Sequence, residues 1–506
     1  MMDPATYQTY RGIPPLAGLC NMERAVEADW SLEESVSRLK RLHYLLRRMH
    51  ETFTSRITAE PIYELKTAYS YHAYLCAEQV SLIRRRVAEM REPPLGLDHV
   101  PHPALERLMD EVSAAPTTVE WLTAAYEIVA AELIAACQRL KKDAHPLADA
   151  PTVRVAKLME FELSDLVSFG RDAVDELKAE EMDAPTASAQ VGSDSSPGAD
   201  LNRWKDYLRD CIAAAGGIDG TGDMSVDVPE PWRSITPYRY DPEPRRDDRF
   251  GDPYNAGVNP EAFLYDERFS AQDKTLMMYY KRLRELDVPE MMASILVDLR
   301  DEEPWEFHME MSRQLWDEAR HAMMGEVGFV ALGLDWTEIP INFTWSRNLN
   351  LQLDARQRHG VLFFIEQGLM PRNGKRYEWE VATQSGDPLS ALFQDFDWAD
   401  EVLHAQIGRR WYVPRYETLK EALSYGDRSW SKVLSHWRDY RDQGLTEHRN
   451  WWPEIYRKAC ERWNKEPAPR ALAFHETYED SRADSVSYTH LTLPTNIIRW
   501  RARGAA

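Results

Sequence analysis

Two Glu-x-x-His segments constrain this 506-residue chain more than any other feature of its sequence. The first, DEARH at 317–321, lies in the long amphipathic stretch from Pro304 to Phe329. The second, DEVLH at 400–404, lies in the stretch from Leu389 to Tyr412. On a helix, a Glu and a His three residues apart point the same way. Each segment can therefore offer a carboxylate and an imidazole to one metal ion.

One Glu-x-x-His arises by chance about once in a chain of this length and composition, so the spacing alone is weak evidence. Both copies share the longer form Asp-Glu-x-x-His-Ala. Both also lie in the middle of a predicted helix with flanking apolar positions. These features together favour a metal site over coincidence.

The first candidate partner is Glu290, which lies fourteen residues before Pro304, whereas Glu318 lies fourteen residues after it. In an antiparallel helix pair closed near Pro304, both carboxylates would stand about 21 Å from the turn, at a rise of 1.5 Å per residue. Glu285 is five residues further out and fits this count less well. We therefore expect Glu290 to meet Glu318 at one level.

The second candidate partner is Glu366, which lies within the apolar run Phe363–Leu369. A lone carboxylate in such a run is costly to bury unless it is paired or bound to a metal. Two Glu residues and two Glu-x-x-His motifs on four helices are the ligand set of ferritin-like di-iron and di-manganese carboxylate proteins.

The stretch from about 273 to 412 resembles the ferritin-like superfamily, and most closely an uncharacterised bacterial ferritin-like family catalogued as a domain of unknown function. The resemblance rests on the order and spacing of six pieces: Glu285 and Glu290; Pro304-Trp305-Glu306-Phe307; 317–321; Glu338-Ile339-Pro340; 365–369; and 400–411. One departure is Pro289, directly before Glu290, where the helix of that family continues uninterrupted.

The resemblance implies a dinuclear metal site. Glu318 and Glu366 would be bridging or chelating carboxylates, Glu290 and Glu401 would be terminal, and His321 and His404 would each serve one metal. Oxygen and imidazole donors suit two Fe ions, with Mn or a mixed Mn/Fe pair as the alternative. The aspartates of the two motifs, Asp317 and Asp400, are open to two interpretations: they orient the imidazoles, or they lie on the surface.

The expected function is that of an O2-dependent di-iron oxidoreductase, of hydroxylase or N-oxygenase type, on a small organic substrate. An electron-donor protein and a homodimer are the other partners considered. Two alternatives stay open at this point. One is a ferroxidase or iron-handling protein, and the other is a non-catalytic helical scaffold stabilised by metal.

Charge and cysteine usage exclude several other classes. The formal net charge of −22 argues against nucleic acid or an anionic membrane as a partner. No apolar run of about 18 residues is present to span a membrane. The five cysteines are scattered and form no CxxC pair, which argues against a disulfide framework and favours a reducing cytoplasm.

Amphipathic helical patterns fill both halves of the chain and predict an all-α fold. We expect an N-terminal helical domain at 1–182, which has carboxylates but no Glu-x-x-His and which we interpret as structural. A linker rich in Pro, Gly and Asp at 183–259 precedes a ferritin-like four-helix bundle at 260–412. Within the bundle, 371–387 is predicted to be a turn-rich interruption. A Trp-rich helical extension at 413–480 is expected to cover the bundle.

The last segment, 486–506, is set apart from the fold. It begins with VSYTHLTLPT, which resembles a translated transposon-type sequencing adapter. We expect this segment to be an assembly artefact. The alternative is an ordinary disordered tail, and neither interpretation gives it a function.

Overall fold

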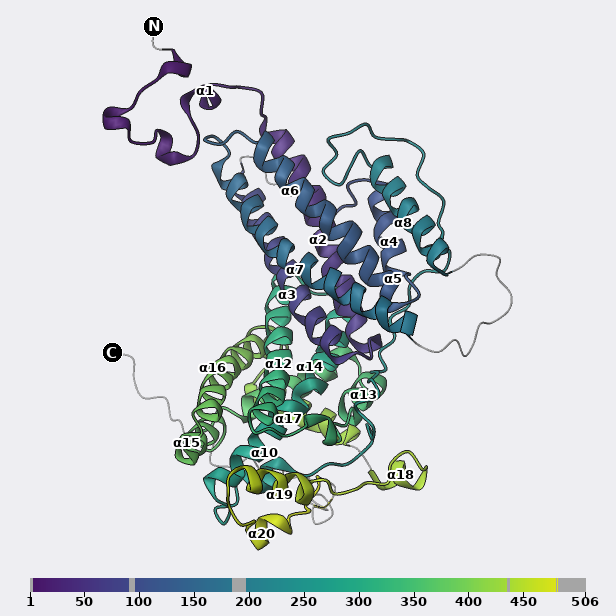
Figure 1. Ribbon diagram of the computed structural model, residues 1–506, viewed down its shortest axis with the longest axis vertical. Coiled ribbons are helices and arrows are strands. Elements are labelled where there is room, and N and C mark those ends of the chain that lie inside the picture. The colour runs from purple at the N-terminus through teal and green to yellow at the C-terminus, as the bar shows by residue number, and fades with distance from the viewer. Residues whose placement is uncertain (1–2, 91–95, 184–196, 435–436, 479, 481–506) are drawn as a thin grey trace. The chain divides into compact units, whose positions relative to one another are not determined.

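A computed structural model describes residues 3–90, 96–183, 197–434, 437–478 and 480 (Figure 1). Over these residues the secondary structure is helical, without a strand, so the fold is all-α as the sequence predicted. No helix in these ranges combines the length and apolarity needed to cross a bilayer. The segment 486–506 lies outside the described residues.

The chain divides into two compact units. The first comprises Met1–Phe53 and His72–Arg239, and the second comprises Thr54–Tyr71 and Tyr240–Ala506. The division at Arg239 falls inside the segment predicted as a linker. The second unit also takes in a short piece of the N-terminal half, and it contains both Glu-x-x-His motifs.

The first unit is built from long helices and contains one short π-helical stretch. In that unit α6 packs along α7, and α4 packs on α8. Its core includes the aromatic ring of Tyr126, whose hydroxyl lies 2.7 Å from Nδ1 of His72. The principal helices that lie partly or wholly in this unit are α2 (Leu32–Ala59), α3 (Tyr63–Ala88), α4 (Pro103–Ser113), α5 (Thr118–Leu122), η4 (Thr123–Ala130), α6 (Ala131–Asp143), α7 (Ala150–Asp183) and α8 (Pro197–Ala214).

The second unit holds the helices on which the predicted metal ligands lie. The helices of this part of the chain are α9 (Pro260–Leu264), α10 (Ala271–Leu283), η6 (Arg284–Leu286), α11 (Asp287–Asp298), α12 (Trp305–Ala331), α13 (Thr344–Gln352), α14 (Ala355–Gly368), α15 (Lys375–Ser385) and α16 (Pro388–Trp411), and the predicted ligands lie on α11, α12, α14 and α16. These are followed by α17 (Leu419–Val433), α18 (Trp437–Asp442), α19 (Trp452–Arg462) and α20 (Pro469–Leu472).

Four helical segments of this unit form a closed ring of neighbours. Helix α10 packs on α12, α12 on α16, α16 on α14, and α14 on α11, which continues the chain of α10 through η6. Figure 1 shows α10, α12, α14 and α16 within the same green part of the molecule. A ring of this kind directs one face of each helix toward a common interior, as in a helix bundle.

The prediction of a turn-rich interruption was wrong for residues 375–385, which form α15. Only the Pro-Arg-Asn-Gly segment before it is a turn, and Gly386 ends the helix with a left-handed φ of 77°. Helix α15 packs on both α10 and α16, and it buries Lys375 in its first turn. A cationic side chain thereby enters the interior of the second unit.

The C-terminal helices pack over α9 and α10. The ring of Trp452 lies 4.9 Å from that of Phe263, and the ring of Trp451 lies 4.5 Å from that of Tyr280. The indole of Trp452 also donates a hydrogen bond to the carbonyl of Ala471, at 2.7 Å. These tryptophans therefore serve as packing residues, as expected of a covering extension.

Gly325 sets the spacing between α10 and α12. A Cβ atom at this position would lie 2.3 Å from the backbone nitrogen of Leu283 and 2.6 Å from the carbonyl oxygen of Tyr279. Both obstacles are backbone atoms that cannot move aside as a flexible side chain could. The absent side chain allows the two backbones to approach, and it holds Glu285 and His321 at facing levels.

We predict that Gly325→Ala lowers the free energy of unfolding by about 1–3 kcal/mol, because α10 and α12 must separate to admit the methyl group. Urea unfolding followed by circular dichroism measures the change. Gly251→Ala is the matched control, since a Cβ atom there meets nothing within 4 Å. Equal stability of the two variants would contradict the close approach.

Candidate metal centre

Five of the six predicted ligands meet in one buried cluster inside the helix ring. Three overlapping groups of side chains each place their ligand atoms within 4.8 Å of one another. The first group is Glu318, Glu366, Glu401 and His404. The other two are Glu285, Glu318 and His321, and His321, Asp397 and Glu401.

We name the two sides of this cluster after their imidazoles. The His404 half is the first group, and the His321 half is the union of the other two groups. Glu318 spans the two halves: its Oε1 lies 3.1 Å from Nδ1 of His404, and its Oε2 lies 3.7 Å from Nδ1 of His321. Glu401 also belongs to both halves, whereas Glu366 belongs to one. The resemblance had implied that Glu318 and Glu366 share the bridging role.

The helices place these side chains by simple periodicity. Glu318 and His321 stand three residues apart on α12, and Glu401 and His404 do the same on α16, so each pair points inward together. Glu366 enters from α14. All five are buried, and none is more than 4 % exposed.

Glu290 does not join this cluster, and Glu285 takes its place. The helical backbone continues from α10 through η6 into α11, so residues five apart point to different sides. The Oε2 atom of Glu285 lies 3.4 Å from Nδ1 of His321. The expectation that Glu290 meets Glu318 is therefore corrected.

Glu285, and not Glu290, faces Glu318 because of where helices α11 and α12 end and begin. Glu285 lies thirteen residues before α11 ends at Asp298, and Glu318 lies thirteen residues after α12 begins at Trp305. Both carboxylates thus stand about 20 Å from the ends of their helices. The count from Pro304 had treated the non-helical connection before it as part of the helix.

Glu290 instead neutralises a buried cationic cluster. Its Oε1 lies 2.6 Å from Nζ of Lys66 and 2.8 Å from Nε of Arg246, and its Oε2 accepts a hydrogen bond of 2.7 Å from Ser346. Burial alone would raise the pKa of Glu290, but Arg246 and Lys66 lower it to about 2. This carboxylate joins α11 to α3 and to the segment before α9.

Asp397 is a member of the cluster that the sequence analysis did not single out. Its Oδ1 lies 3.5 Å from Nδ1 of His321, and its side chain is fully buried. The signal that could have revealed it is its position one turn before Glu401 on α16, which aligns the two carboxylates on one helix face.

The aspartates of the two motifs orient the imidazoles in a crossed arrangement. Nε2 of His321 lies 3.2 Å from Oδ2 of Asp400, and Nε2 of His404 lies 3.3 Å from Oδ2 of Asp317. Each aspartate thus contacts the histidine of the other motif. Arg320 joins them, because its guanidinium contacts Asp317 and lies 2.8 Å from Asp400. In each imidazole Nδ1 is left facing the interior.

The interior of the cluster contains six buried polar atoms that make no well-aligned hydrogen bond to any described residue. Buried polar atoms without a well-aligned hydrogen bond are rare in native proteins, and the capacity to bind an ion is one explanation for them. Oxygen and imidazole donors are ligands that Fe(II) and Mn(II) accept, so the residues present fit a metal. The six atoms are Oε2 of Glu285, Oε1 of Glu318, Oε2 of Glu366, Oε2 of Glu401, and Nδ1 of His321 and of His404.

Two buried cations lie beside the cluster. The Nζ atom of Lys375 lies 2.9 Å from Glu401 and 2.9 Å from Asp397. Arg282 contacts Asp397 and lies 2.9 Å from Glu285. Arg282 and Lys375 are both 0 % exposed. They compensate part of the negative charge that the carboxylates bring into the interior.

The pKa values of Glu366 and Glu401 are shifted in opposite directions. Burial, together with the Glu401 and Glu318 carboxylates, raises the pKa of Glu366 well above its ordinary value. Burial would also raise the pKa of Glu401, but Lys375 and the contact with Glu366 lower it well below its ordinary value. In the metal-free cluster a proton shared by this pair therefore favours Glu366 over Glu401.

The imidazoles are shifted toward their protonated forms. Burial alone would lower the pKa of His321, but its contacts with Asp400 and Glu285 outweigh burial and raise it to about 10. Burial is likewise outweighed at His404, where Asp317 and Glu318 raise the pKa well above its ordinary value. A metal ion must displace these protons to bind Nδ1.

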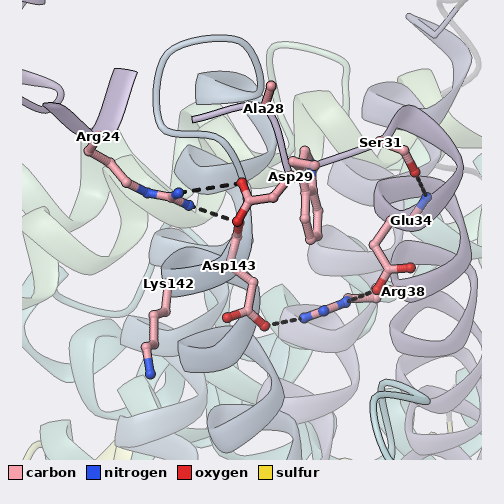
Figure 2. A pocket seen from close by; sticks show the side chains of 9 residues that line it. Arg24, Ala28, Asp29, Ser31, Glu34, Arg38, Lys142 and Asp143 are labelled. Atoms are coloured by element: carbon pink, nitrogen blue, oxygen red, sulfur yellow. Dashed lines mark hydrogen bonds and ion pairs between the residues drawn. The ribbon is translucent and has the colours of Figure 1, made fainter. Parts of the chain in front are cut away.

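The described residues of the first unit form no comparable group of carboxylate and imidazole donors. That unit does contain an open cavity between the start of α2 and the end of α6, and Figure 2 shows its lining. Arg38 there pairs with Glu34 and Asp143, at 2.9 and 2.8 Å. Because acids and bases pair within the wall, the cavity offers no cluster of unpaired donors.

Comparisons of this chain with family models, with curated proteins and with solved structures found no match.

The first prediction from this geometry separates Glu290 from Glu285. Glu290→Gln removes the ion-pair carboxylate of buried Lys66 and one of the two of buried Arg246, which keeps Asp287, so the free energy of unfolding should fall by about 3 kcal/mol or more. Mn(II) binding, measured by calorimetry, should keep the wild-type stoichiometry. Glu285→Gln should reverse this pattern, with weaker metal binding and a smaller loss of stability, because Arg282 keeps Asp397 as a partner. Loss of metal binding in Glu290→Gln but not in Glu285→Gln would contradict these roles and would identify Glu290 as a metal ligand.

The second prediction concerns pH. Glu366, His321 and His404 all have raised pKa values, so the metal-free cluster holds protons that binding must release. Raising the pH removes these competitors, and Mn(II) affinity should increase by about tenfold or more per unit between roughly pH 6 and pH 8. Titration calorimetry in buffers of different ionisation enthalpy counts the released protons. An affinity that is independent of pH would contradict these assignments.

Proposed function

We propose that this chain is a ferritin-like dinuclear-metal protein that works as an O2-dependent di-iron oxidoreductase of hydroxylase or N-oxygenase type. The proposed substrate is a small organic molecule. The observation that carries the proposal is the set of six inward-facing donor atoms without a well-aligned hydrogen bond, four from carboxylates and two from imidazoles. They come from helical segments that follow one another around the ring.

Charge supports two divalent ions rather than one. Glu285, Glu318, Glu366, Asp397 and Glu401 bring five negative charges when ionised, and Arg282 and Lys375 bring two positive ones. Buried charges are stable only when they are paired or bound to metal, and the three negative charges that remain exceed what one Fe(II) can neutralise. Two ferrous ions held together supply the electrons with which such centres reduce dioxygen.

The chain's own residues would hold these ions and keep water away from them. Asp317 and Asp400 fix the imidazoles so that Nδ1 faces inward. Gln314 donates a hydrogen bond of 3.2 Å to Oε1 of Glu366, which leaves Oε2 directed at the cluster. Because the donors come from helices, which hold side chains in place better than loops, little rearrangement is needed on binding.

The proposal predicts the behaviour of Glu318→Gln. Wild-type protein loaded without oxygen should hold about two Fe(II) per chain and, once mixed with O2 and a reductant, should consume O2 repeatedly without forming a mineral. Glu318→Gln removes the carboxylate shared by both halves and should lose most of this activity. Glu306→Gln, an exposed change on the same helix, should behave as wild type.

The outcomes distinguish this function from its alternatives. Oxidation and retention of iron far beyond two ions per chain would indicate a ferroxidase. Tight Fe(II) binding that raises the unfolding temperature but leaves O2 untouched would indicate a metal-stabilised scaffold. If wild-type protein binds no Fe(II) or Mn(II), the dinuclear site itself is refuted.

A further inference from the structure

The buried cations Arg282 and Lys375 pair mainly with the carboxylates of the His321 half. In the His321 half, Arg282 lies 2.9 Å from Oε1 of Glu285, and Lys375 lies 2.9 Å from Asp397. Lys375 also lies 2.9 Å from Oε1 of Glu401, the oxygen that is not directed at His404. Every carboxylate of this half except Glu318 therefore has a guanidinium or an ammonium as a direct partner.

The His404 half has less of this compensation, because Glu401 alone of its three carboxylates is paired with a lysine or arginine among the described residues. In the part of the chain that the structure describes, no lysine or arginine forms an ion pair with Glu318 or Glu366. The third carboxylate of this half, Glu401, presents Oε2 at 3.6 Å from Nδ1 of His404, on the side away from Lys375. Two of the three carboxylates that converge on the imidazole, Glu318 and Glu366, thus have no lysine or arginine as an ion-pair partner among the described residues.

This difference in charge changes how strongly each half attracts a divalent ion. Like charges a few ångströms apart in a buried site repel by several kcal/mol even at an effective dielectric constant of about 20. A divalent ion entering the His404 half meets two carboxylates without a cationic partner and competes with Lys375 only for Glu401. One entering the His321 half meets Arg282 and Lys375, and it must compete with them for Asp397, Glu285 and Glu401.

We propose that Lys375 and Arg282 make the two halves unequal, so that metal loads in sequence: the His404 half binds the first divalent ion tightly, and the His321 half binds the second at least about tenfold more weakly. This inference rests on the proposed dinuclear site. Lys375 and Arg282 act as positioning residues, because they act on the metal through the carboxylates they hold. The centre therefore passes through a stable state with one ion, in which a different second metal can be added.

The test is a titration of the full-length metal-free protein with Mn(II), followed by calorimetry and by electron paramagnetic resonance. Two separate binding steps are expected. The first should give the spectrum of an isolated Mn(II), and the second should replace it with the spectrum of a coupled pair. His404→Ala should abolish the tight step, whereas His321→Ala should keep the tight step and lose the weak one.

Lys375→Met tests the cause of the inequality. Removing the ammonium should strengthen the second step by about tenfold or more, and it should change the first step less, because Glu401 is the one carboxylate of the His404 half that contacts Lys375. Lys281→Met is the matched control: this buried lysine lies 2.5 Å from Glu378 and forms no ion pair with a proposed ligand. Circular dichroism verifies that both variants are folded.

The results separate failure of this inference from failure of the proposed function. Two ions binding in a single step of equal affinity would overturn sequential loading while supporting the dinuclear site. A tight step lost in His321→Ala and kept in His404→Ala would also overturn it, even if Lys375→Met does not fold. A protein that binds no Mn(II) at all would refute both.

Discussion

The second unit depends on a single electrostatic constraint, which is that five carboxylates, four buried and one partly buried, share one interior. Glu285, Glu318, Glu366, Asp397 and Glu401 cannot all be ionised there unless positive charge accompanies them. The chain supplies some of it through Arg282 and Lys375. The ring of helices, the contact at Gly325 and the insertion of α15 all serve to bring these charges together and to hold them at fixed distances.

How much of this could be predicted depended on whether a residue's position is set within one helix or between helices. The helical pattern was enough for the all-α fold and for the pairs Glu318–His321 and Glu401–His404, because spacing along one helix determines direction. Glu366 could be predicted for a different reason, because a carboxylate inside an apolar run indicates a buried acid that needs a partner. These inferences needed no knowledge of neighbouring segments.

The remaining features depended on geometry that no local pattern contains. Glu285 was passed over for Glu290 because the non-helical connection between α11 and α12 was counted as helix. The segment that carries Lys375 has a turn at its start, and that turn concealed the helix after it. The crossed contacts of Asp317 and Asp400 depend on how α12 and α16 are rotated relative to each other, which only the packed structure specifies.

The crossed aspartate contacts also determine when the two imidazoles become oriented as the chain folds. The partners His321 and Asp400 are separated by 79 positions in the chain, and Asp317 and His404 by 87. A nascent chain that has folded only as far as α14 can already bring Glu285, Glu318 and His321 together, but neither imidazole is held by its aspartate. Both imidazoles gain that contact in the same event, when α16 docks, so the two rings are oriented together and late in synthesis.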